Sequence, residues 1–420
     1  MAIAPLLFLL LIALPLGAQT RHALDLKSFD KVWSTVRDTH WEKRPGGLDW
    51  DAIGKEYRPR VEAAATSDEA RTVMREMLGR LRQTHFGIFS EQVYDSLEDG
   101  DGPSGSGETG LDVRPMEGQV VVVSIQPGSP AERAGVHLGW VVQSVNGRPL
   151  EPLIVAARQN PDIHVLQLTR SFLARLSGPV GGQLDVEFLD GRGERVPLRL
   201  GLAAPRGELA EFGNLPPQRV WYEEKRLGVT AYVRFNVFLD IPRVIPGFGR
   251  TLQGCKPCDG LVIDLRGNPG GIGGMAAGMA GFLVEKTNQK LGTMYMRDAT
   301  LNFVINPRPD VFGGPVAVLI DGTSASTAEI FAGGLQALGR ARVFGTRSAA
   351  AALPSLLTRL PNGDGFQYAV ANYISQDGKP LEGVGVTPDE EVLLNRRTLL
   401  AGQDAVLDRA LVWIQEQKGK

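Results

Sequence analysis

The sequence predicts an α+β protein of several domains, with a helical N-terminal region, a small β-rich module and a larger core where strands and helices alternate. Three observations lead to this prediction. A chain of 420 residues is too long for one hydrophobic core. Apolar residues recur at helical spacing up to about residue 83 and at strand spacing between about 110 and 203. Beyond about residue 217, continuous apolar runs alternate with helical stretches, as in a buried α/β sheet.

The composition is that of a globular protein. Hydrophobic residues make up 43% of the chain and charged residues 22%, and the formal net charge is −2. Basic residues are mixed with acidic ones along the chain, without a run of five or more. We therefore expect no nucleic-acid partner.

The first eighteen residues are strongly apolar. Residues 2–18 carry no charge, and the run is broken at Pro15 and Gly17. A bilayer span needs about 20 apolar residues, and this run is shorter. We interpret residues 1–18 as a signal peptide cut after Ala18, which predicts an exported protein, periplasmic or secreted, with no stable membrane span. The alternative is an uncleaved anchor.

Apolar stripes at helical spacing follow. One stripe comprises Phe29, Val32, Trp33 and Val36, and a second runs from Ala70 to Leu81 after a helix-start signal at Ser67. We expect about three helices in an N-terminal domain of residues 19–97. Residues 98–109 are acidic and rich in glycine and serine, which predicts a flexible linker.

The next segment, residues 110–203, has five or six short alternating runs and is expected to form one compact β module. A short helix within it begins at Ser129-Pro130 and stops at Gly135.

Residues 204–420 are expected to form the core domain. The predicted strands are 227–233, 261–265 and 316–320, and the predicted helices are 272–285 and 327–338. A hairpin spanning 356–373 and an amphipathic helix at 395–417 are expected after them. Cys255 and Cys258 are spaced C-x-x-C ahead of an expected strand. With no nearby histidine to complete a zinc site, a local disulfide is favoured over a redox motif.

A serine begins the helix after one buried strand. The run Val316–Ile320 ends in a turn of small residues, and a helix is expected from Ser326. Amides in the first turn of a helix point toward negative charge that develops there, which suits acyl transfer. The alternative is structural, because Ser326-x-x-Glu329 is also a capping box.

A glycine-rich turn follows another core strand, at Asp264-Leu-Arg-Gly-Asn-Pro-Gly-Gly271. Glycines let backbone amides approach a ligand without a Cβ in the way, so Gly270 or Gly271 is a candidate oxyanion donor. The alternative is a turn that only requires positive φ. Residue types alone do not single out His85 among the five histidines.

Three motifs in order resemble the tail-specific, or C-terminal-processing, serine proteases. They are Asp264–Gly271, Thr323-Ser-Ala-Ser326-Thr-Ala-Glu-Ile-Phe and Leu381-Glu-Gly-Val-Gly-Val-Thr-Pro-Asp389. The resemblance implies a catalytic core of the crotonase-like or ClpP-like ββα fold. It also implies a serine-type peptidase with Ser326 as nucleophile, and neither a metal nor an organic cofactor.

The resemblance also bears on the catalytic base. The better-known branch uses a lysine at the position that Ala351 occupies in this chain. A second branch, which includes the tricorn protease, uses serine with histidine and glutamate. The chain resembles this branch more closely, which implies His85 as base, Thr84 as a relay and Glu382 as the orienting acid. The oxyanion would then be bound by amides of Thr327 and of Gly270 or Gly271.

The β module resembles a PDZ domain. Thr109-Gly-Leu-Asp-Val113 stands where its carboxylate-binding loop would be, and Ser124–Gly135 matches a later signature. The resemblance implies that Gly110, Leu111, Asp112 and Val113 bind the extended C-terminal end of a protein or peptide substrate as an added strand.

These inferences predict an exported serine peptidase that hydrolyses protein substrates through an acyl-enzyme at Ser326, with a PDZ domain binding substrate C-terminal segments. The alternative is an inactive PDZ-containing relative that only binds peptides. A crotonase-type acyl-CoA enzyme is suggested by the fold alone, and the expected signal peptide and PDZ domain disfavour it, since a shared fold does not dictate function.

Overall fold

A six-stranded sheet forms the centre of the core, in the order β12-β13-β14-β17-β18-β22. The computed structural model describes residues 16–98, 106–159, 165–212, 215–255 and 258–418. The first two strands are antiparallel and the others run parallel. The strands are β12 (Tyr222–Leu227), β13 (Thr230–Phe235), β14 (Gly260–Asp264), β17 (Val316–Ile320), β18 (Arg342–Gly345) and β22 (Glu390–Glu391).

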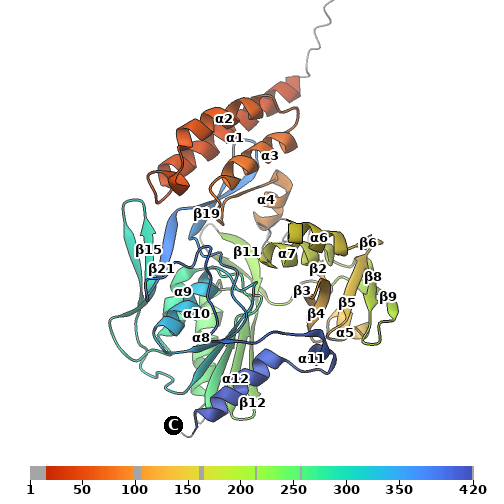
Figure 1. The fold of residues 1–420 in the computed structure, drawn as a ribbon, viewed down its shortest axis with the longest axis vertical. Helices are drawn as coiled ribbons and strands as arrows, with labels where there is room; N and C mark the ends of the chain where they lie inside the picture. The colour runs from red at the N-terminus through yellow and green to blue at the C-terminus, as the bar shows by residue number, and fades with distance from the viewer. Residues whose placement is uncertain (1–15, 99–105, 160–164, 213–214, 256–257, 419–420) are drawn as a thin grey trace, which may run out of the picture.

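Helices cover both faces of this sheet. Side chains of β14 alternate, so that Leu261 and Ile263 pack with α8 (Ile241–Gln253), α9 (Gly273–Ala280) and α10 (Thr327–Ala337). Val262 packs with residues of α12 (Ala405–Glu416). Helix α12 lies against the sheet in Figure 1. The central strands β14 and β17 are buried along their whole length and are mostly apolar, because neither of their faces meets water.

Several predicted core elements need correction. Residues 227–233 do not form one strand, because Gly228 (φ +60°) makes the turn between β12 and β13. The helix expected at 395–417 is divided into α11 (Arg396–Leu400) and α12. Helix α8 was not predicted. Cys255 and Cys258 form the expected local disulfide.

Smaller sheets extend from the core. β19 (Ser355–Arg359) and β20 (Gly365–Ala369) form the predicted hairpin, and β1 (Gly87–Phe89) pairs with β20. The hairpin ends there, since β21 (Ala371–Ser375) joins another sheet with β15 (Gln289–Met296) and β16 (Thr300–Ile305). β10 (Glu208–Phe212) and β11 (Leu215–Val220) form a further hairpin.

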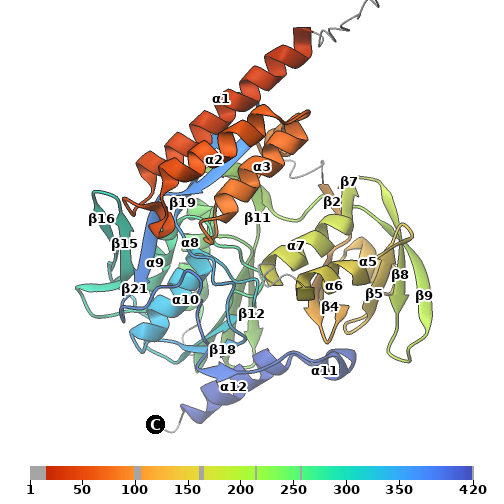
Figure 2. The same cartoon turned by 45° about the horizontal axis from the view of Figure 1, so that its top comes forward.

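The three predicted N-terminal helices are present. They are α1 (Leu16–Thr39), α2 (Trp50–Glu62) and α3 (Ser67–Gly79), with a 3-10 turn at Pro45–Gly47 and a later helix α4 (Glu91–Glu98). Their apolar stripes bury Phe29, Val32 and Met74 together with Leu360 and Phe366 of the β19–β20 hairpin. The helical part therefore shares its hydrophobic core with a hairpin from far along the chain. Figure 2 shows β19 lying behind these helices.

Most of the predicted signal peptide lies outside the described residues. Helix α1 begins at Leu16 and contains Ala18, the expected cleavage position. Within the described ranges, no helix is both long and apolar enough to cross a membrane.

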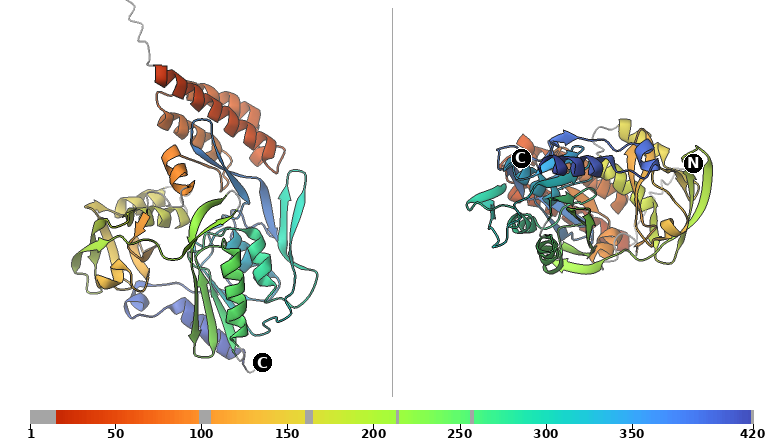
Figure 3. Two further views of the ribbon diagram at one scale, coloured as in Figure 1. Left: turned by 180° about the vertical axis from the view of Figure 1, so that it is seen from behind. Right: turned by 90° about the horizontal axis from the view of Figure 1, so that it is seen from below.

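The β-rich module lies beside the core and below the helices (Figure 3). Its sheet has the order β3-β4-β5-β8-β9, with β3 at an edge. Its own hydrophobic core includes Val113, Phe172 and Phe188. The elements are β2 (Ser106–Glu108), β3 (Leu111–Met116), β4 (Gln119–Ile125), α5 (Pro130–Arg133), β5 (Val141–Val145), β6 (Arg148–Pro149), α6 (Glu151–Gln159), α7 (Val165–Arg175), β7 (Ser177–Pro179), β8 (Gln183–Leu189) and β9 (Arg195–Gly201).

The linker expected at 98–109 is shorter in the structure. Residue 98 still belongs to α4, and Ser106–Glu108 forms β2, which pairs with β7 of the module. Residues 99–105 of the predicted linker lie outside the described residues. Helices α6 and α7 were not predicted.

Candidate active site

Ser326 lies directly before α10, after the turn that follows β17. Its backbone has φ +53° and ψ −119°. A serine that only caps a helix normally has an extended backbone, whereas positive φ costs energy for any residue with a Cβ. Glu329 Oε2 accepts the Ser326 N–H at 2.9 Å, as in the predicted capping box. The strained conformation goes beyond what a cap requires, and such strain is typical of functional sites.

The glycine-rich turn packs against this serine. A Cβ at Gly270 would lie 2.7 Å from both Ser326 Cβ and Thr327 N, so only glycine fits there. The Gly270 N–H donates to Asn268 Oδ1 at 2.9 Å. Across the described part of the chain, no acceptor is seen for the N–H groups of Gly271 and Thr327. These two amides, and not that of Gly270, are thus available beside Ser326.

Thr84, His85 and Glu382 form one hydrogen-bonded chain. Glu382 Oε1 accepts the Thr84 N–H at 2.7 Å, and Thr84 Oγ1 donates to Glu382 Oε2 at 2.9 Å. Thr84 Oγ1 also lies 2.7 Å from His85 Nδ1. A hydroxyl has one proton and an ionised carboxylate only accepts, so the hydroxyl must accept from His85. The proton of neutral His85 is therefore on Nδ1, and Nε2 keeps a free lone pair.

His85 sits in the connection between α3 and β1, also with positive φ (+61°). Its removal from water lowers the pKa of the imidazole to about 4, and the charge of Arg170 adds to this shift. His85 is consequently neutral near pH 7, the state in which an imidazole can accept a proton.

Residues 348–352 connect the serine to the histidine cluster. Ala351 O accepts the Ser326 N–H at 2.8 Å, and Ala349 N donates to Ser324 O at 3.0 Å. One residue on, Ala352 N donates to Glu382 Oε2 at 3.1 Å. Ala351, at the position of the lysine in the other branch, thus contributes backbone groups to the site.

The predicted peptide-binding residues lie at the start of β3. Gly110 has φ +81°, and a side chain there would clash with Ser129. Leu111 and Val113 contribute to the core of the module. Asp112 instead pairs with Arg114 and lies 3.7 Å from Arg234 of the core domain.

Sequence reasoning missed the ion pair that ties this module to the turn before Ser326 (residues 321–325). Arg114 Nε donates to Asp321 Oδ2 at 2.8 Å. Asp321 Oδ1 accepts the N–H groups of Thr323 at 2.9 Å and of Gly267 at 3.3 Å, so it holds both loops of the site. Neither Arg114 nor Asp321 belongs to a sequence motif that would identify it as part of the site.

The module also contacts the site through α7. Leu166 packs against Ala325, Ala349 and Ala351, all buried next to Ser326. A Cβ at Gly322 would lie 3.0 Å from Val165, so the first residues of α7 contact the turn before Ser326.

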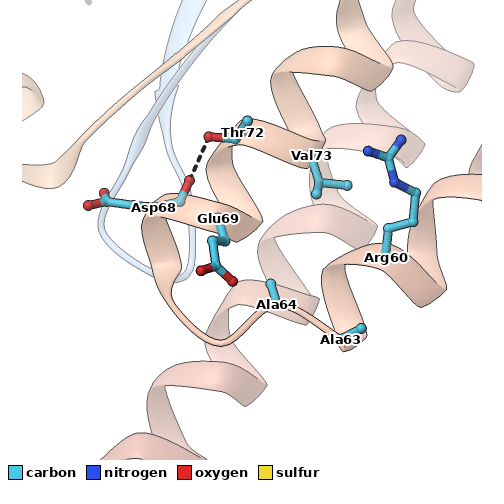
Figure 4. Close-up of a pocket in the computed structure, with 7 residues that line it drawn as sticks. All are labelled: Arg60, Ala63, Ala64, Asp68, Glu69, Thr72 and Val73. Carbon is cyan, nitrogen blue, oxygen red and sulfur yellow. Dashed lines mark hydrogen bonds between the residues drawn. The ribbon is translucent and has the colours of Figure 1, made fainter.

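A pocket between α2 and α3 lies elsewhere, on the helical part (Figure 4). It is lined by Arg60, Ala63, Ala64, Asp68, Glu69, Thr72 and Val73. Over the ranges that the structure describes, no group of three or more His, Cys, Asp or Glu is arranged to hold a metal ion.

Two segments of the chain are similar to known families of peptidases. Residues 229–392 match the model of Peptidase family S41, and residues 26–79 match that of the Tricorn protease C1 domain. The first match covers β13 through β22 and thus Ser326, the glycine-rich turn and Glu382.

Curated relatives extend over most of the chain. A chloroplastic carboxyl-terminal-processing peptidase 3 of Arabidopsis thaliana is 24% identical over 386 residues, 90% of this chain and 71% of the relative. A putative tricorn protease homolog 2 of Streptomyces coelicolor is 26% identical over 408 residues. That match covers 92% of this chain but only 32% of the relative.

A solved structure has a similar fold. The photosystem II D1 C-terminal processing protease superposes with a TM-score of 0.60 at 21% identity, covering 91% of this chain and 98% of that one. At this identity the likeness concerns the mixed α/β fold.

Proposed function

We propose that this chain, a serine-type peptidase related to carboxyl-terminal-processing proteases, hydrolyses protein substrates through an acyl-enzyme on Ser326. In this proposal His85 is the general base, Thr84 and Glu382 hold it, and two backbone amides bind the oxyanion. The observation that carries the proposal is the Thr84–His85–Glu382 chain, which assigns the proton to Nδ1 and leaves Nε2 free.

The reaction follows from these roles. Ser326 Oγ attacks the scissile carbonyl while His85 Nε2 takes its proton, and the oxyanion is held by the N–H groups of Thr327 and Gly271. His85 then gives the proton to the leaving amine, and water repeats the sequence to release the acyl group. Gly271 is favoured over Gly270 as a donor because the Gly270 amide already binds Asn268.

A Ser-His mechanism is favoured over a Ser-Lys one. Ala351 replaces the lysine, while a histidine, a hydroxyl and a carboxylate are joined by hydrogen bonds within one cluster. The pKa of His85 keeps it unprotonated over the neutral range. No observation favours the inactive alternative.

We further propose that residues 110–203 are a PDZ domain, placed between a helical domain (19–97) and a crotonase-like or ClpP-like core domain (204–420). Strand β3 is at a sheet edge, where an extended substrate end can add as a strand near Gly110 and Leu111. Export by a signal peptide ending at Ala18, to the periplasm or outside the cell, completes the proposal.

The test is intact mass after reaction with a serine-directed phosphonate probe. We expect one adduct on the wild type, none on Ser326→Ala and much slower labelling of His85→Ala. The same three proteins are compared for hydrolysis of an unfolded test protein. Hydrolysis that persists in Ser326→Ala would show that the nucleophile is elsewhere.

A further inference from the structure

A buried carboxylate lies directly beneath the proposed nucleophile. Glu329, in the first turn of α10, is 0% exposed. Its Oε2 accepts the N–H groups of Ser326 at 2.9 Å and Ala351 at 3.0 Å. Its Oε1 accepts Ser348 Oγ at 2.5 Å and the Ala350 N–H at 2.9 Å. The carboxylate thus binds the nucleophile with one oxygen and the 348–351 segment with both.

That segment continues to the residues around the proposed base. Ser348 Oγ accepts the Val386 N–H at 2.7 Å, and Gly383 N donates to Ala350 O at 2.9 Å. Ala352 N donates to Glu382, the partner of Thr84. Residues 348–352 thus link Ser326, which donates to Ala351 O, to Glu382, which accepts from Ala352 N.

A capping role does not account for this arrangement. A capping glutamate needs only the bond to the N-cap amide and is normally at the surface. Burying a carboxylate is unfavourable, and burial raises the pKa of Glu329 to about 7 in spite of its four hydrogen bonds. The groups that bind it are all neutral, namely the Ser348 hydroxyl and three backbone amides.

We propose that Glu329 is a positioning residue, which fixes the proposed nucleophile relative to the His85 assembly by holding residues 348–351 against Ser326. The inference rests on the proposed function at Ser326. It assigns to Glu329 a role in the geometry of the reaction in addition to helix capping.

The experiment measures the rate of Ser326 labelling by the phosphonate probe in the full chain from pH 5 to pH 9. Glu329→Gln keeps the shape of the side chain but replaces one carboxylate oxygen by an NH₂ group. That group cannot accept the two hydrogen bonds that the oxygen accepted. We expect wild-type labelling to fall as the pH drops below about 7, as Glu329 takes up a proton. Glu329→Gln should be slower at pH 8 by roughly tenfold or more and should lack that inflection.

Asp364→Asn is the matched control. Asp364 is also 0% exposed. It accepts hydrogen bonds from the Arg71 guanidinium and the Glu91 N–H, both of which belong to the N-terminal helical part and not to the surroundings of Ser326. It should lower thermal stability and leave the labelling rate and the pH profile of the folded protein unchanged. A profile altered as much in this variant as in Glu329→Gln would overturn the inference, because loss of any buried carboxylate would then suffice.

Two further outcomes separate the proposals. Wild-type labelling at Ser326 with an unchanged rate and profile in Glu329→Gln would overturn the positioning role alone. Absence of any Ser326 adduct on folded wild type would overturn the proposed function instead. If Glu329→Gln does not fold, Ser348→Ala removes one donor and the link to Val386. Its labelling should then be slower, and a wild-type rate would refute the inference.

Discussion

Replacing Asp321 by asparagine tests how the β module is held to the turn before Ser326. The side chains of Arg114 and Asp321 are 9% and 14% exposed, and the guanidinium donates to Oδ2 at 2.8 Å. Asparagine keeps the shape and the Oδ1 acceptor for Thr323 and Gly267. The substitution therefore removes mainly the negative charge that faces Arg114.

The magnitude follows from burial. Burial alone would raise the pKa of Asp321, but the Arg114 charge and the hydrogen bonds from Thr323 outweigh it and lower that pKa. Removing one partner of a buried ion pair typically costs about 3–5 kcal/mol. Arg114 keeps Asp112 as a second partner, so we expect the lower end, about 3 kcal/mol.

The assay is urea unfolding of the wild type, Asp321→Asn and Asp185→Asn at pH 7. Asp185 pairs with Arg199 in the same module, but both side chains are 66% exposed, and such pairs contribute about 0–1 kcal/mol. Asp321→Asn should therefore lower the free energy of unfolding by roughly 2 kcal/mol more than Asp185→Asn. A difference below about 0.5 kcal/mol would refute the reasoning that burial makes the Arg114 pair strong.

Three other substitutions test the site. Thr84→Val removes the acceptor for the His85 Nδ1 proton and should lower kcat for peptide hydrolysis by roughly tenfold or more, with KM unchanged. Gly270→Ala places a Cβ 2.7 Å from that of Ser326, so Ser326 labelling should fall by about 10² or more while circular dichroism is unchanged. Glu329 has its pKa raised to about 7 from 4.5, so the folded chain holds this proton more tightly than the unfolded one. The stability that this proton contributes is present below pH 4.5 and is lost as the pH rises through about 7. The unfolding free energy of the wild type, relative to that of Glu329→Gln, should therefore fall by about 3 kcal/mol over this pH range.

Local signals allowed part of the molecule to be predicted. The strand, small-residue turn and helix around Ser326 are adjacent in sequence, and each has its own apolar pattern. Helix α8, which was not predicted, contains Pro242 and Pro246, and proline disfavours the interior of a helix. Pro242 lies in the first turn, where no N–H is needed, and burial of Val244 and Phe248 stabilises the helix around Pro246.

The histidine cluster could not be predicted from residue types. His85 differs from the other histidines through its hydrogen-bonded neighbours Thr84 and Glu382. Thr84 and Glu382 are 298 positions apart in the sequence. Only the family resemblance pointed to these residues. Asp321 and Arg114 gave no signal at all, because an ion pair across 207 positions has no local pattern.

The hydrophobic core shared by the N-terminal helices and the β19–β20 hairpin bears on the order of folding. Met74 of α3 packs in this core with Leu360 and Phe366 of the hairpin, and His85 follows α3 directly. Contacts this distant in sequence form late, since closing so long a loop is entropically unfavourable. A chain still emerging during synthesis, or one that has locally unfolded at the helices, thus has Ser326 without the proposed base. With His85 as the proposed base, Ser326 would then become reactive only once the helices and the hairpin have assembled.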